Sequence, residues 1–397
     1  MSFGYVFMKT NKKILGLLGT GHGITDVNQG VLPMMLAYLQ PAFALSQFQV
    51  GLAMLVFNVS SSVIQPAFGI FSDRVRAPWL IPLGCFLAGL GMSMTGFSPN
   101  YPLLLLAVLI SGLGIAAYHP EGSKFARYSS GGKKATGMSV FSIGGNFGFA
   151  AGPVLASFLF ALGGLSGSIG LLALNGSMAL LLWIFLGRIV NTENAYIEYA
   201  HRTQDKEHKR TFNIRSKEVV IPLVLLTLVV IIRSWVHFGM VTFLPQYYVN
   251  YLEQSPGFAA ILTTVFLLSG AGGTLVAGPL ADRIGLKNVI SGSMLVLIPL
   301  MYLFTLATGY MVTVLVALLG FAVVSTFSVT VVFSHELLPY NVGLASGITL
   351  GFGIGMGGVG TSILGWVADT WGLPMVFQVM IFLPLLALVL TLFLPRR

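Results

Sequence analysis

The chain has 397 residues, of which 55% are hydrophobic and only 8% are charged. Soluble domains carry about 25% charged residues, so this composition excludes a soluble globular protein and indicates an integral membrane protein. The formal net charge of +9 is explained by membrane topology and anionic lipid, and we expect no nucleic-acid partner. Cys85 is the only cysteine, which excludes disulfides and cysteine-based metal sites.

Apolar segments follow one another along the whole chain, and most exceed the roughly 20 residues that a spanning helix requires. The sequence predicts an all-α membrane protein with twelve transmembrane helices. We expect them at about 14–39, 48–71, 79–97, 101–120, 137–161, 168–188, 219–249, 258–280, 287–306, 310–333, 343–367 and 372–394.

Lysine and arginine indicate the orientation. Of the 21 basic residues, 20 lie before the first segment, in every second loop or after the last segment. The positive-inside rule therefore places both termini and these loops in the cytoplasm. The remaining basic residue is Arg233, which lies within the seventh segment.

The two halves of the chain resemble each other. A Gly-x-x-x-Asp-Arg motif follows the second segment at Gly69–Arg74 and the eighth at Gly278–Arg283. We expect two six-helix bundles, residues 1–188 and 218–397, joined by a polar cytoplasmic linker at 189–217. Such a duplication suits a transporter in which one half rocks against the other about a central site.

Two segments each carry a pair of polar residues inside the membrane. His22 and Asp26 lie four positions apart in the first segment, and so do Arg233 and His237 in the seventh, so each pair shares one helix face. Asp26 lies about 18 Å along its helix, near the middle of a layer about 30 Å thick. Ionisable residues at that depth normally face a partner or a transport pathway.

The roles of these residues leave alternatives open. The guanidinium of Arg233 keeps its charge, so we expect it to bind an anionic group of the substrate; the alternative is a structural ion pair with Asp26. Asp26 is the best candidate for a proton carrier, and its protonation would free Arg233 for the anion; His22 and His237 are alternative carriers. His22, Asp26 and His237 also suit Zn or Fe, but the nearby charge of Arg233 argues against a metal, and the only driving force we expect is the proton gradient.

Other polar residues are candidates for binding or for gating. Gln65, Asn146 and Gln246 could donate hydrogen bonds to a substrate, or join helices. At the cytoplasmic face we expect ion pairs between Arg74 and Glu121 and between Arg283 and Glu336, as latches that close that side; the alternative is solvated loop charge. The complete gating set is Asp73, Arg74, His119, Glu121, Asp282, Arg283 and Glu336.

Glycine is dense in the fifth and eleventh segments. Small residues allow membrane helices to approach closely, so these segments predict tight packing. The same surfaces could form a pliable interface between the two halves.

These motifs resemble those of the major facilitator superfamily. The duplicated loop motif resembles its loop signature, and Gly148-x-x-x-Gly152-Pro153 resembles its proton-antiporter signature. More narrowly, Tyr118-His119-Pro120-Glu121 and Gly144-Gly145-Asn146-Phe147-Gly148 resemble stretches of the fosmidomycin-resistance proteins. One departure is Arg76, which stands where the superfamily loop usually has glycine, whereas Gly285 keeps it.

The resemblance implies the major facilitator fold, with pseudo-two-fold symmetry, in a bacterial inner membrane. It also implies a proton-coupled antiporter that exports a small anionic or amphipathic compound such as fosmidomycin, and we expect it to act as a monomer. An uptake symporter or uniporter for an anionic metabolite is the first alternative, and a receptor that binds without transport is the second. The sequence has no Walker lysine motif, nucleophile elbow or HExxH, so we expect no enzyme activity.

Overall fold

The computed structural model describes residues 10–131, 134–203, 217–338, 345, 347–353 and 355–395, and its regular elements in these ranges are helices. The first half contains α1 (Lys12–Ala42), α2 (Gln47–Asn58), η1 (Val59–Val63), α3 (Gln65–Val75), α4 (Leu80–Thr95), α5 (Tyr101–Ser129), α6 (Lys134–Gly163), η2 (Gly164–Ser168), α7 (Ile169–Ile184) and α8 (Leu186–Thr203). The second half contains α9 (Lys217–Gln246), η3 (Tyr247–Tyr251), α10 (Pro256–Ile284), α11 (Leu286–Leu306), α12 (Tyr310–Leu337), η4 (Gly347–Gly353), α14 (Gly357–Trp371) and α15 (Leu373–Leu392).

The helices account for the twelve predicted membrane crossings. Nine helical stretches of the described residues are long and apolar enough to cross a membrane, and one of these, Gly137–Ile184, contains both α6 and α7. Two further crossings are α4, which has only 16 residues, and α1, which carries polar residues such as Asp26. The predicted all-α fold with twelve transmembrane helices is confirmed.

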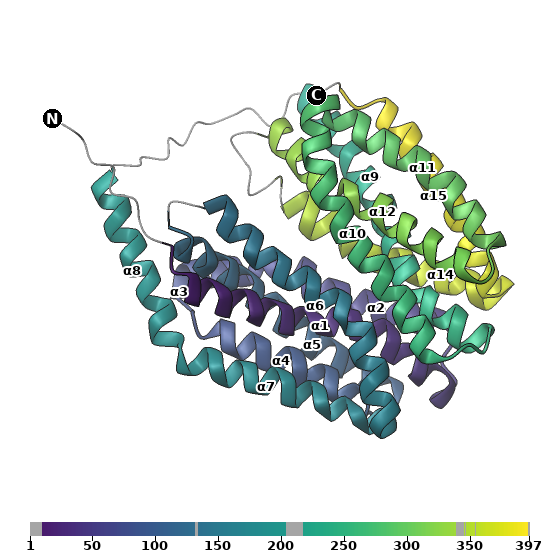
Figure 1. Ribbon diagram of the computed structural model, residues 1–397, viewed down its shortest axis with the longest axis horizontal. Helices are drawn as coiled ribbons and strands as arrows, with labels where there is room; N and C mark the ends of the chain where they lie inside the picture. The colour runs from purple at the N-terminus through teal and green to yellow at the C-terminus, as the bar shows by residue number, and fades with distance from the viewer. Residues whose placement is uncertain are drawn as a thin grey trace.

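The helices form two bundles that follow the two halves of the sequence (Figure 1). In the first bundle α1 packs on α6, and α4 packs on α5 and α7; in the second, α10 packs on α12, and α15 packs on α9 and α11. The bundles meet where α2 packs on α14 and where α6 packs on α10. The expected linker at 189–217 begins within α8, and its residues 204–216 lie outside the described part of the chain.

Glycine brings α2 and α14 into backbone contact. A Cβ atom on Gly51 would meet the backbone of Thr361, and one on Gly365 would meet the backbone of Gln47. Thr361 Oγ1 also donates a hydrogen bond to the carbonyl oxygen of Gly51, at 3.1 Å. The glycines of the eleventh segment therefore form part of the interface between the bundles, where small residues permit this close approach.

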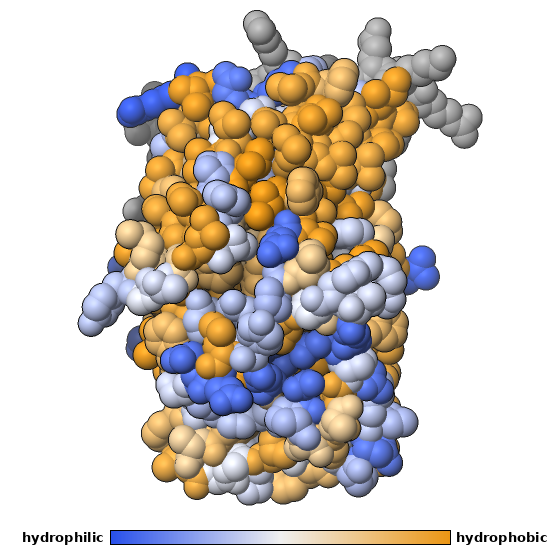
Figure 2. Space-filling model, turned by 90° about the vertical axis from the view of Figure 1, so that its right-hand side faces the viewer, coloured by the Kyte–Doolittle hydropathy of each residue, from blue (hydrophilic) through white to orange (hydrophobic). Residues whose placement is uncertain are grey.

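Hydrogen bonds join the bundles towards the end of the molecule that lies opposite α8. Asp369, near the end of α14, accepts hydrogen bonds from the backbone N–H groups of Gln47 at 2.6 Å and Phe48 at 2.8 Å, the first residues of α2. Asn250 in η3 donates to the carbonyl oxygen of Ala37 in α1, at 3.0 Å. Figure 2 faces this end and shows hydrophilic residues in a band between two apolar areas. The bundles are therefore held together at this end.

The loop after α3 adopts a positive φ at Arg76, where the superfamily loop usually has glycine. Arg76 adopts a left-handed conformation with φ of 50°, and Gly285, at the matching place after α10, has φ of 90°. The Arg76 side chain is held by α8, because its Nη2 lies 2.9 Å from Glu193 Oε2 and donates to Asn194 Oδ1 at 3.3 Å. Positive φ is unfavourable for a residue with a Cβ atom, so these contacts help to stabilise the turn.

We expect Asp369→Ala to loosen the contact between the bundles at the end opposite α8. A carboxylate at an exposed helix N-terminus contributes about 1 kcal/mol, so its loss would shift the ratio of closed to open molecules about fivefold. Spin labels at Phe97 and Tyr310, which are 55% and 95% exposed at this end, would then report longer distances. Glu253→Ala removes an exposed carboxylate at the same end and should leave the distances unchanged; equal effects of the two substitutions would contradict the prediction.

Candidate functional site

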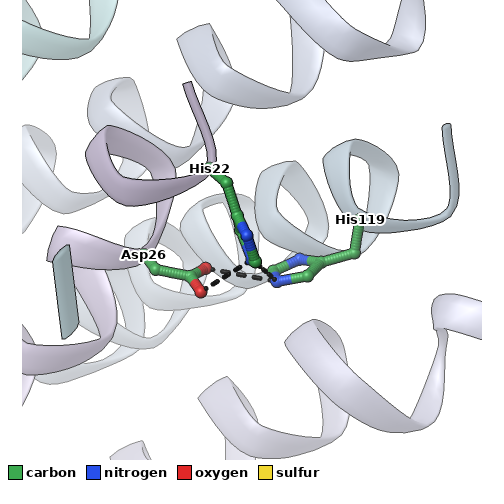
Figure 3. Close-up of side chains that lie close together, drawn as sticks. All are labelled: His22, Asp26 and His119. Atoms are coloured by element: carbon green, nitrogen blue, oxygen red, sulfur yellow. Dashed lines mark hydrogen bonds and ion pairs between the residues drawn. The ribbon is translucent and has the colours of Figure 1, made fainter. Parts of the chain in front are cut away.

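Three ionisable side chains meet inside the first bundle (Figure 3). His22 and Asp26 come from α1, and His119 comes from α5. His22 Nε2 lies 3.1 Å from Asp26 Oδ2, His119 Nε2 lies 3.3 Å from Asp26 Oδ1, and the two Nε2 atoms are 3.0 Å apart. Only 6% of Asp26 is exposed, so the two imidazoles supply the polar surroundings that water would otherwise give its carboxylate.

A glycine of α6 makes room for this cluster. A Cβ atom on Gly145 would lie 2.6 Å from His22 Nε2 and 2.8 Å from Asp26 Oδ2. The ring of His22 stacks on Phe141, one turn earlier in α6, with centroids 4.1 Å apart. The helices α1, α5 and α6 together therefore fix the positions of the three side chains.

The hydrogen bonds of the two histidines decide where their protons lie. His22 Nδ1 is 2.8 Å from the carbonyl oxygen of Phe141, and His119 Nδ1 is 2.8 Å from that of Ile115. A carbonyl oxygen can only accept a hydrogen bond, so both Nδ1 atoms carry a hydrogen. In their neutral forms both Nε2 atoms then carry only lone pairs, and these face each other and the carboxylate of Asp26. Three acceptors at this spacing repel one another unless a proton or another cation lies among them.

The same side chains could also hold a metal ion. Their donor atoms lie within 4.8 Å of one another, and two imidazoles with a carboxylate suit Zn or Fe. Histidines that bind metals commonly donate their other N–H group to a carbonyl oxygen, as both do here. The sequence suggested such a set with His237 as the third member, whereas the structure supplies His119. Experiments must therefore distinguish a metal ion from a proton at this position.

Arg233 lies in the second bundle, without a counter-ion among the described residues. It is 5% exposed on α9, its Nε atom has no hydrogen-bond acceptor, and its guanidinium lies 5.2 Å from the centre of the Phe327 ring in α12. The structural ion pair between Arg233 and Asp26, considered from the sequence, is not present: Asp26 is paired with His22 and His119 instead. Depth along two helices predicted that both residues are central, but not that each faces its own bundle.

The other candidates for binding do not join this cluster. His237 lies among aromatic rings, with centroids 5.0 Å from Phe238 and 5.7 Å from Phe266. Gln246 accepts a hydrogen bond from Asn250 at 2.8 Å. Gln65 donates to the carbonyl oxygen of Ser61 in its own crossing, at 2.7 Å, and Asn146 is exposed on α6. Their proposed contact with substrate remains a prediction.

His119 is the member of the cluster that the sequence placed wrongly, at the gating face. The apolar pattern predicted that the fourth segment ends near Pro120, but α5 continues to Ser129. Membrane helices tolerate proline because neighbouring groups satisfy the freed carbonyl. His119 therefore lies well inside the helix, and residues 122–126, which include the charged Lys124, gave no apolar signal that the helix continues.

The expected gating pairs are not formed in this structure. Glu121 is buried and forms an ion pair with Lys124, one turn along α5, and Lys124 also donates to Ser72 Oγ at 2.9 Å. Among the described residues no ion pair joins Arg74 to Glu121 or Arg283 to Glu336. The side chains of four gating candidates are exposed, and that of Asp73 lies outside the described part; the exposed ones are Arg74, Asp282, Arg283 and Glu336.

Comparisons with known proteins agree with this architecture. The family model of the Major Facilitator Superfamily matches residues 18–255 and 226–397. The chain is 33% identical over 392 residues to the fosmidomycin resistance protein of Escherichia coli (strain K12), covering 98% of this chain and 94% of that protein. It is 32% identical to the uncharacterized MFS-type transporter YfnC of Bacillus subtilis (strain 168), covering 94% and 91%.

Solved structures resemble the fold at low sequence identity. A bacterial homolog of the human lysosomal transporter Spinster, in an inward-facing and unoccupied conformation, has a TM-score of 0.75 at 14% identity, covering 98% of this chain and 97% of that one. The nucleoside transporter NupG has a TM-score of 0.72 at 15% identity, covering 96% and 98%. At this identity the likeness concerns the fold alone.

We expect Gly145→Ala to destabilise the protein, because the added methyl group must displace His22 or Asp26. Overpacking of this kind costs about 1–3 kcal/mol. Gly176→Ala on α7 is the matched control, since its Cβ atom would meet nothing within 4 Å, and alanine favours the helix. In detergent, the midpoint of thermal unfolding should fall for the first variant and stay or rise for the second; an unchanged midpoint for Gly145→Ala would show that the cluster is free to move.

Proposed function

Because this chain belongs to the major facilitator superfamily, we propose that it is a secondary active transporter that exports a small anionic or amphipathic compound in exchange for protons. The observation that carries the proposal is the distribution of buried charge. One bundle holds a carboxylate with two imidazoles, and the other holds an arginine without a counter-ion among the described residues.

Arg233 supports an anionic substrate. A buried guanidinium presents several N–H donors in a plane, an arrangement that matches the oxygens of a phosphonate, phosphate or carboxylate. Phe327 offers an apolar surface beside it, which suits the carbon skeleton of an amphipathic compound. The name of the Escherichia coli relative points to fosmidomycin, and we propose a phosphonate of this kind as a substrate.

The cluster of His22, Asp26 and His119 supports coupling to protons. One proton on either Nε2 atom would convert the three mutually repelling acceptors into a hydrogen-bonded group with no net charge. Loss of that proton leaves one negative charge in an apolar environment, which is costly. We propose that the cluster, rather than Asp26 alone, gains and loses the transported proton, and that neither a cofactor nor a metal ion takes part.

The separation of the two sites limits the ways in which the proposed coupling can work. The anion and the proton bind in different bundles, so they do not compete directly as the sequence suggested. Antiport then requires that each rocking step of the two bundles carries either the anion or the proton across the membrane, but never both together. The same separation is the observation that favours the alternative of a symporter. An anion bound to Arg233 would neutralise the arginine, and a proton bound to the cluster would neutralise the carboxylate, so binding both would neutralise both buried charges.

The proposed setting is a bacterial inner membrane with both termini in the cytoplasm. The distribution of lysine and arginine supports this orientation. We propose that the functional unit is a monomer.

We expect purified protein in liposomes to release trapped fosmidomycin several-fold faster when the outside is made acidic. Protons entering down their gradient would drive the phosphonate out. Arg233→Ala should abolish the flux, whereas Arg233→Lys, which keeps the charge but loses the planar donor pattern, should retain part of it. Faster release when the inside is acidic would instead show symport, and binding without any flux would support a receptor.

We expect His119→Asn to remove the effect of the pH gradient on this flux, so that the rates with and without the gradient become about equal. His237→Asn is the matched control, because His237 lies among aromatic rings of the second bundle; its gradient effect should persist. A chelator should change neither result. Loss of flux in chelator, with recovery on addition of zinc, would show that the cluster holds a metal and would contradict the proton assignment.

A further inference from the structure

A groove lies at one end of the first bundle, where α1 begins and α7 leads into α8. Its volume is about 570 Å³. Polar and cationic side chains line one part, and apolar side chains line the other. The lining residues are Asn11, Lys13, Ile14, Leu17, Leu181, Phe185, Arg188 and Asn191.

The polar part of the groove is electropositive. Lys13 and Arg188 are both exposed there, and none of the lining residues is acidic. The helix α1 begins at this place, and it has no acidic residue in its first turn. A helix N-terminus carries a partial positive charge, so α1 adds to the field of the two side chains. The groove therefore favours an anion.

The apolar part of the groove continues onto the lipid-facing surface. Leu181 is 40% exposed, and its neighbours Trp183 and Ile184 are 60% and 66% exposed on α7. Because α1 and α7 cross the membrane, their ends lie at its surface, where headgroups meet acyl chains. A ligand in this groove must then combine an anionic group with an apolar chain.

We propose that this groove binds one anionic phospholipid. Its phosphate contacts Lys13 and Arg188, the amides of Asn11 and Asn191 donate hydrogen bonds to headgroup oxygens, and an acyl chain lies along Leu17, Leu181 and Phe185. Basic pockets between membrane helices are suited to such headgroups. A soluble phosphate would leave the apolar wall without a partner, so a lipid fits the groove better. This binding is separate from the transport proposed above and does not depend on its direction or substrate.

Native mass spectrometry of the purified full chain in detergent tests the proposal. Wild type should retain one phosphatidylglycerol molecule in preference to phosphatidylcholine. In the double variant Lys13→Gln/Arg188→Gln the preference should fall about thirtyfold, which corresponds to about 1 kcal/mol for each cation. Lys12→Gln is the matched control, because Lys12 is an exposed neighbour on α1 that does not line the groove; it should keep the preference.

Each other outcome would overturn the proposal. An equal loss in Lys12→Gln would mean that the lipid responds only to the general charge of this end. Displacement of the lipid by glycerol phosphate at equal concentration would identify a soluble anion as the occupant. Absence of any preference in wild type would show that the groove does not hold an anionic lipid.

Discussion

A carboxylate in the middle of a membrane is stable only beside a compensating charge or hydrogen-bond donor, and the first bundle is arranged around this requirement at Asp26. One turn of α1 supplies His22, and α5 supplies His119. The backbone carbonyls of Phe141 and Ile115 hold the two rings so that both Nε2 atoms point inward. Gly145 leaves α6 close enough to cover the group. The close packing of these three helices and the polar site therefore depend on each other.

The second bundle treats its buried charge differently, although the sequence repeats. Arg233 lies within the seventh crossing, but the described residues around it offer an aromatic ring rather than a carboxylate. Its neighbour His237 likewise faces aromatic rings. The duplication thus preserves the arrangement of the helices, while the chemistry of the two centres differs. In the first bundle neighbouring imidazoles compensate the charge of Asp26, whereas in the second bundle no described side chain compensates the charge of Arg233.

The sequence predicted the features that depend on one helix at a time. Hydropathy located the crossings, the repeated Gly-x-x-x-Asp-Arg motif predicted the two halves, and spacing placed His22 and Asp26 on one face. Features that depend on how helices turn towards one another were predicted less well. Spacing gives the depth of Arg233 but not its direction, so it could not decide between an anion site and the alternative ion pair with Asp26, which is not formed. His119 was misplaced because the apolar pattern ends near Pro120, whereas α5 continues past it.

The contact of Asp369 with α2 has a consequence for how this protein tolerates mutation. The donors are the main-chain N–H groups of Gln47 and Phe48, so the side chains at these positions do not form the bonds. Any residue other than proline supplies the same donor. Random substitutions in the first turn of α2 should therefore leave this contact intact. On α14, by contrast, the contact depends on the side chain of Asp369 alone. A mutational scan of this interface should therefore find that substitutions of Asp369 weaken the contact, whereas most substitutions of Gln47 and Phe48 do not.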